Sequence, residues 1–196
     1  MKGSTSAEVG CGSFALTVSE DETANRSAIQ AFLSAAIGEP GELTDSLIDC
    51  PAKSLSLLTT WEERYQLSTH LANGKTRPIV IVPITPAQSS RASVFDALEL
   101  GPNYRVVVVK SEWFGKSDDY RRWNGSQLRQ RLLSAGGLEL TMPRLAPYIA
   151  ADLDDESLTF SEGLKKLDVL DASSLSHWLR TAETALKPLF DLMEKS

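Results

Sequence analysis

The segment that decides the fold begins with Pro78-Ile-Val-Ile-Val-Pro83 and ends with Tyr104-Arg-Val-Val-Val-Val-Lys110. Neither run shows the alternation of a strand with one wet face, and an unbroken apolar run is typical of a parallel strand buried on both sides. A helical pattern from about Ser90 to Leu100 separates the two runs. Strand, helix and strand in this order predict a βαβ unit.

The same alternation extends in both directions along the chain. Upstream lie a β-type run, Ser13–Ser19, a second apolar run, Leu43–Asp49, and a helical stretch from about Lys53 to Leu71. Downstream, a helix from about Tyr120 to Ser134 precedes a further short strand, Leu138–Met142. We therefore predict an α/β fold with an open, mostly parallel sheet and flanking helices.

Length and hydropathy favour one domain. A chain of 196 residues suits a single α/β domain over 1–196, in which 1–12 is flexible or irregular. Apolar residues at steps of three and four predict a C-terminal amphipathic helix over 173–195. No apolar run approaches the roughly 20 residues that a membrane-spanning helix needs, so we expect a cytoplasmic protein that does not bind membranes.

Charge argues against a dedicated nucleic-acid binder, because the formal net charge is −6 and phosphate neutralisation needs a basic surface. Locally the sign reverses, since six basic residues and three acidic ones lie between Lys110 and Arg131. Trp113, Phe114 and Trp123 lie among these basic residues, where they would either stack on nucleic-acid bases or pack in the core. The two cysteines indicate neither a disulfide framework nor a zinc site, and we predict no metal centre.

Four segments in order resemble a family. They are Asp49-Cys-Pro51, Val80-Ile-Val-Pro83-Ile-Thr-Pro86, Val106-Val-Val-Val-Lys110 and Gly136-Gly-Leu-Glu-Leu-Thr-Met-Pro143-Arg-Leu145. In sequence and spacing the chain resembles the later part of a ParA/MinD-type, deviant Walker ATPase. The resemblance is closest to the TraL-like and ParA-like proteins of plasmids and other mobile elements. It implies a P-loop NTPase-like three-layer fold and a role in DNA partition or conjugal transfer.

The resemblance also implies site residues. Asp49 would be the Walker B or switch carboxylate that orients Mg²⁺ or water. Lys110, Pro143 and Arg144 would lie at the nucleotide, with Lys110 standing where the family commonly has an adenine-reading Asn. Many ParA-like proteins bind DNA non-specifically through basic residues late in the chain. The positions that match this property are Arg121, Arg122, Arg129 and Arg131.

The family's first strand, phosphate loop and helix are missing from the N-terminal part. Lys2-Gly3 follows no apolar strand and leads to no Gly-Lys-Ser/Thr, so the lysine and backbone N–H groups that cradle phosphates are lacking there. We therefore expect no cofactor and no ATP turnover by the chain alone. ATP and Mg²⁺ would bind only if a phosphate loop were supplied or if the chain were truncated.

Each candidate has a simpler alternative. Asp49 would also suit the start of the helix that follows it, because carboxylates are favoured there, and the arginines would also form a solvated helix face. Two functions follow: a ParA/TraL-like mobile-element protein with an incomplete nucleotide site, or a non-catalytic interaction or dimerisation module on the same scaffold. The expected partners are a second copy or another mobile-element protein, with weak DNA binding.

Overall fold

The computed structural model describes residues 26–27, 29–31, 33–34, 47–50, 54–74 and 76–194. The first seven of these residues are helical. The elements that follow are α2 (Ser54–Tyr65), α3 (Leu67–Asn73), β1 (Ile79–Ile84), α4 (Ser90–Glu99), β2 (Arg105–Ser111), the 3₁₀ helix η1 (Ser117–Tyr120), α5 (Arg121–Asn124), α6 (Gln127–Ser134), β3 (Leu138–Met142), α7 (Pro147–Asp155), α8 (Phe160–Lys166) and α9 (Val169–Glu194).

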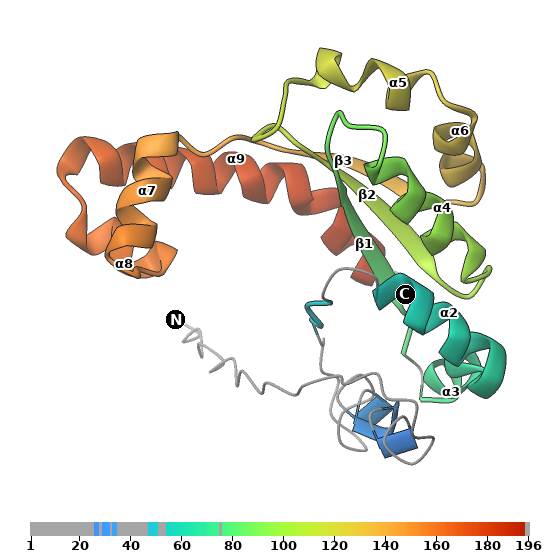
Figure 1. Ribbon diagram of the computed structural model, residues 1–196. Helices are drawn as coiled ribbons and strands as arrows, with labels where there is room; N and C mark the ends of the chain where they lie inside the picture. Colours follow the sequence, from blue (N-terminus) through green and yellow to red (C-terminus); the bar gives the residue numbers. More distant parts are fainter. Residues whose placement is uncertain are drawn as a thin grey trace.

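Three parallel strands form a sheet in the order β1-β2-β3. Val108 of β2 lies opposite Val82 of β1 and Glu139 of β3, which fixes the register on both sides. Because consecutive strands are neighbours and parallel crossovers are right-handed, α4, α5 and α6 lie on the same face of the sheet. Figure 1 shows these helices on one face and α9 on the other. The predicted α/β class with an open parallel sheet and flanking helices is confirmed.

The valine run of β2 serves two cores at once. Val106 and Val108 pack with residues of α4, α5 and α6, whereas Val107 and Val109 pack with Leu189 of α9. All four valines are buried. Alternate side chains of a strand point to opposite faces, so an apolar run without alternation is the pattern that a central strand between two helical layers requires.

A separate helical cluster lies beyond the sheet. Helices α7 and α8 pack against the first half of α9 around Ile149, Leu153 and Leu175. Gly163 of α8 allows this approach, because a Cβ at that position would lie 2.4 Å from Leu153 Cδ2. The second half of α9 runs on beneath the sheet, so this one long helix belongs to both cores (Figure 1).

The predicted buried strand ending at Asp49 is wrong for the part that can be described. Residues 47–50 have no regular secondary structure, and Leu47 is 90% exposed. Asp49 itself is exposed. A short apolar pair such as Leu47-Ile48 does not form a strand unless a neighbouring strand accepts its hydrogen bonds, and sequence periodicity does not reveal that partner. The run at Ser13–Ser19 lies outside the described residues.

Two predicted long helices are each broken by a residue with non-helical geometry. The stretch Lys53–Leu71 divides into α2 and α3 at Gln66, which has a left-handed backbone with φ of 50°. At this break, the Glu62 carboxylate accepts hydrogen bonds from Ser68 and from the Tyr104 hydroxyl, the latter at 2.7 Å. The bond to Tyr104 ties α2 to the start of β2.

The second break divides the expected Tyr120–Ser134 helix into α5 and α6. Gly125 follows the last turn of α5, and Ser126 adopts an extended backbone with ψ of 146°. The Ser126 hydroxyl accepts a hydrogen bond from the Arg129 N–H at 3.1 Å, which is a standard N-cap. The break turns α6 back along the sheet.

Tyr120 joins the carboxyl ends of two strands. Its side chain is buried, and its hydroxyl lies 2.8 Å from the Ser111 carbonyl oxygen and 3.1 Å from that of Ile84. We predict that Tyr120→Phe lowers the free energy of unfolding by about 1–2 kcal/mol, because buried carbonyls lose their donor. Urea denaturation measures this loss. The matched control is Tyr148→Phe at an exposed position, where an equal loss would contradict the prediction.

Candidate functional site

Three loops meet at the carboxyl edge of the sheet. They are residues 85–89 after β1, 112–116 after β2 and 143–146 after β3. The Glu112 N–H donates to the Met142 carbonyl at 3.0 Å, and a Cβ on Gly115 would lie 3.0 Å from Pro86 Cγ. In open parallel sheets this edge is where ligands bind. It is therefore the place to look for the predicted site residues.

Lys110 is part of a charge cluster centred on Glu139. Its ammonium nitrogen lies 3.0 Å from Glu139 Oε1, and Lys110 is only 6% exposed. The other carboxylate oxygen accepts hydrogen bonds from Arg129 Nε at 2.7 Å and from Trp123 Nε1 at 2.8 Å. The carboxylate thus joins β3 to β2, α5 and α6.

The pKa of Glu139 reflects these partners. Burial by itself raises the pKa of the carboxyl, but donation from Arg129, Lys110 and Trp123 and the charge of Lys110 outweigh burial. The pKa therefore lies below its ordinary value, and the group stays ionised. Sequence reasoning missed Glu139, although a single carboxylate inside the apolar run Leu138–Met142 was a usable signal.

This cluster bears on the expected nucleotide role of Lys110. The structure places its charged atom against a carboxylate inside the molecule, so the ammonium is already partnered. A role in reading a nucleotide base stays a prediction for this residue. The geometry assigns Lys110 a structural role in any case, because a buried cation needs a compensating anion.

Pro143 and Arg144 lie in the loop after β3, at the carboxyl edge of the sheet. Their role at a nucleotide stays a prediction. The Pro143 carbonyl accepts a hydrogen bond from Trp178 Nε1 of α9 at 3.0 Å. The guanidinium carbon of Arg144 lies 5.4 Å from the centroid of the Trp113 ring. This cation–π contact brings together loops that follow two different strands.

The four arginines of the predicted DNA surface do not act alike. Arg129 binds Glu139, and Arg131 pairs with Glu99 at 2.7 Å and lies over the Phe95 ring. Arg121 and Arg122 on α5 are exposed and have no ion pair with any described residue. Of the proposed set, the structure leaves these two free for an external partner.

One motif escaped the sequence reasoning. Gly115-Lys116-Ser117 follows a parallel strand and precedes a helix, as the end of a phosphate loop does. The glycine required five residues before Gly115 is replaced by Lys110. The Lys116 N–H already donates to Asp119 Oδ2 at 2.8 Å, so the chain's own carboxylate takes the donor that a phosphate would use.

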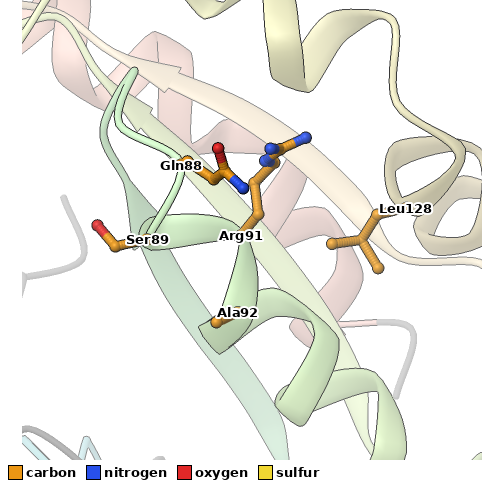
Figure 2. A pocket seen from close by; sticks show the side chains of 5 residues that line it. All are labelled: Gln88, Ser89, Arg91, Ala92 and Leu128. Atoms are coloured by element: carbon orange, nitrogen blue, oxygen red, sulfur yellow. The ribbon is translucent and has the colours of Figure 1, made fainter.

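A shallow hollow of about 460 Å³ lies where α4 begins. Figure 2 shows Gln88 and Arg91 side by side on one wall and Leu128 of α6 on the other, while Ser89 points away. Arg91 Nε is buried and has no hydrogen-bond partner in the described part of the chain. Among the described residues that line this open hollow, Arg91 alone is charged.

Comparison with known proteins finds a relative with a similar sequence. Over 121 residues the chain is 26% identical to Protein MobD of Acidithiobacillus ferrooxidans, an alignment that covers 62% of this chain and 53% of that protein. The chain thus spans about half the length of the curated relative it matches. No family model matches the chain. Separately, none of the described helices is long and apolar enough to cross a membrane.

We predict that Glu139→Gln destabilises the fold on the order of 3 kcal/mol, because removing the anion leaves the buried Lys110 ammonium uncompensated. Urea denaturation again gives the measurement. The control is Glu99→Gln, which removes an equivalent charge from the surface pair with Arg131 and should cost less than about 1 kcal/mol. Equal losses of unfolding free energy in the two variants would show that the buried ion pair stabilises the fold no more than the surface pair does.

The same carboxylate predicts a pH dependence. Because its folded pKa lies below its unfolded pKa, Glu139 contributes stability that is fully present above the unfolded value. That contribution is lost as pH falls through the folded pKa. The difference in unfolding free energy between wild type and Glu139→Gln should therefore shrink between about pH 7 and about pH 3. A difference that stays constant over this range would contradict the assignment.

Proposed function

We propose that the chain is a ParA/TraL-like protein of a plasmid or other mobile element, that it acts in DNA partition or conjugal transfer, and that its nucleotide site is incomplete. The observation that supports a mobile-element protein is the similarity to Protein MobD over 121 residues. The parallel α/β architecture is compatible with it. The similarity favours a mobile-element role, and the fold alone does not, because one scaffold serves many unrelated functions.

The incomplete site is argued from electrostatics. Binding of the ATP phosphates requires an unpaired lysine and free backbone N–H donors that converge in one loop at the carboxyl edge. In this chain Lys110 is neutralised by Glu139, and the Lys116 N–H is taken by Asp119. Asp49 lies in a segment without regular structure. These contacts support a chain that by itself neither holds nor hydrolyses ATP.

A second candidate function is a non-catalytic interaction or dimerisation module. The observation that favours it is the outer edge of β1, which pairs only with β2 among the described strands. Ile81 in the middle of β1 is 41% exposed, although it lies in an apolar strand. An apolar edge strand that no other described strand pairs with offers its backbone hydrogen-bonding groups to a second chain.

The biochemical prediction concerns ATP. The purified full chain should show no Mg-ATP turnover above background and no thermal stabilisation by Mg-ATP. The reason is that no loop in the described part of the chain offers the phosphates an unpaired lysine together with free backbone N–H donors. Turnover that disappears in Asp49→Ala would overturn the incomplete-site proposal and restore Asp49 as a catalytic carboxylate. Light scattering on the same samples separates the two candidates further, since a dimer without nucleotide binding favours the interaction module.

The biological prediction concerns the mobile element. Deleting the coding sequence from the element that carries it should lower the frequency of transfer or of retention through cell division, and a copy supplied in trans should restore it. Counting recipient colonies and plasmid-bearing cells measures the two frequencies. If both frequencies are unchanged by the deletion, the proposed mobile-element function is wrong, whatever the ATP experiments find.

A further inference from the structure

The loop after β2 exposes two adjacent aromatic side chains. Trp113 is 45% exposed and Phe114 is 60% exposed, whereas Trp123, the third aromatic of this region, is buried. Large aromatic side chains usually bury most of their area when a core is within reach. Trp113 and Phe114 instead lie at the edge of the sheet where parallel α/β proteins hold ligands.

The exposed pair is held on an ordered loop. Backbone hydrogen bonds join Glu112 to Met142 at 3.0 Å and Phe114 to Ser111 at 3.1 Å. The Tyr120 hydroxyl and the Asp119 carboxylate fix the two ends of the same loop. Because these bonds restrain the backbone before any partner arrives, the entropy lost on binding through Trp113 and Phe114 is small.

One cationic group contacts the aromatic pair, and three more follow the pair closely in the sequence. Arg144 lies over one side of the Trp113 ring at 5.4 Å, and Lys116, Arg121 and Arg122 follow in the next two turns. All four side chains are exposed, and none has an ion pair with a described residue. Figure 1 shows the loop after β2 and the segment leading to α7 leaving the same end of the sheet. We call these six residues the aromatic–basic surface.

We propose that the aromatic–basic surface binds single-stranded nucleic acid, with bases stacking on Trp113 and Phe114 and phosphates meeting Lys116, Arg121 and Arg122. Unpaired bases have free π-faces that stack on aromatic rings, while cations beside them track the backbone. A duplex keeps its base faces stacked inside and offers phosphates and groove edges, on which an aromatic ring cannot stack. The combination of exposed rings and free cations therefore fits a single strand better than a duplex.

The net charge of −6 limits the strength of this binding. Glu112, Asp118 and Asp119 lie in the same stretch, and only Asp119 is engaged with a backbone N–H. Repulsion by these carboxylates makes the interaction weak, and the loss of affinity with added salt comes from the contacts between cations and phosphates. Stacking, which salt does not screen, then contributes a larger share of the affinity than it does in a basic protein.

The test is fluorescence anisotropy of a labelled oligothymidylate of about 16 nucleotides, at the upper end of common single-strand site sizes, added to the full chain. A duplex of equal length and free ATP are the comparison ligands. We expect binding at low salt, with the single strand preferred to both comparison ligands. No binding at low salt, equal affinity for the duplex, or binding of ATP alone would each overturn the inference.

Variants separate stacking from charge. Trp113→Ala combined with Phe114→Ala should weaken single-strand binding about tenfold or more and leave the salt slope unchanged. Arg121→Gln with Arg122→Gln should reduce that slope by about 1.4, or about 0.7 for each lost phosphate contact. Phe190→Ala and the double change Lys165→Gln with Lys166→Gln are the controls, since these residues are exposed elsewhere and should have no effect.

This inference deepens the proposed function by naming a partner, and the two fail separately. If deletion of the coding sequence lowers transfer or retention but oligothymidylate does not bind, the mobile-element function stands and the aromatic–basic surface has no nucleic-acid role. If oligothymidylate binds through Trp113 and Phe114 but deletion has no effect, the aromatic–basic surface is a nucleic-acid site and the proposed mobile-element function is wrong. Circular dichroism of each variant confirms that a loss of binding does not reflect unfolding.

Discussion

The arrangement of β2, β3, α5 and α6 depends on the ion pairs and hydrogen bonds of the Glu139 carboxylate. It lies on β3 and receives donors from β2, α5 and α6 through Lys110, Trp123 and Arg129. A charge so placed is stable only while its partners surround it, since an unpaired buried ion loses its hydration without compensation. One carboxylate thereby fixes how two strands and two short helices lie relative to one another.

The same cluster separates structure from function at the carboxyl edge. The inward-pointing Lys110 is paired with Glu139. The backbone N–H of Lys116, a donor that could otherwise bind a phosphate, already donates to Asp119. Cations that point outward, Arg121 and Arg122 among them, stay free. The edge consequently lacks the features that hold a triphosphate but retains exposed rings and charges, which suit a longer and more weakly held ligand.

Sequence patterns predicted best where the pattern had one physical meaning. The valine run of β2 is buried on both faces because a central parallel strand has no wet side. The sequence patterns failed where a single residue ended a helix. Gln66 and Gly125 each divide a helix whose apolar spacing continues across the break. The segment before Asp49 had strand-like composition, yet residues 47–50 form no strand, because pairing depends on a neighbour rather than on composition.

The sequence by itself determined the α/β class, the parallel sheet, the apolar character of its strands and the surplus of basic residues between Lys110 and Arg131. Only the tertiary structure decided which of those charges are available. Arg129 and Arg131 have carboxylate partners, while Arg121 and Arg122 do not. Periodicity records local chemistry, whereas ion pairing depends on distances between residues far apart in the chain, and those distances exist only after folding.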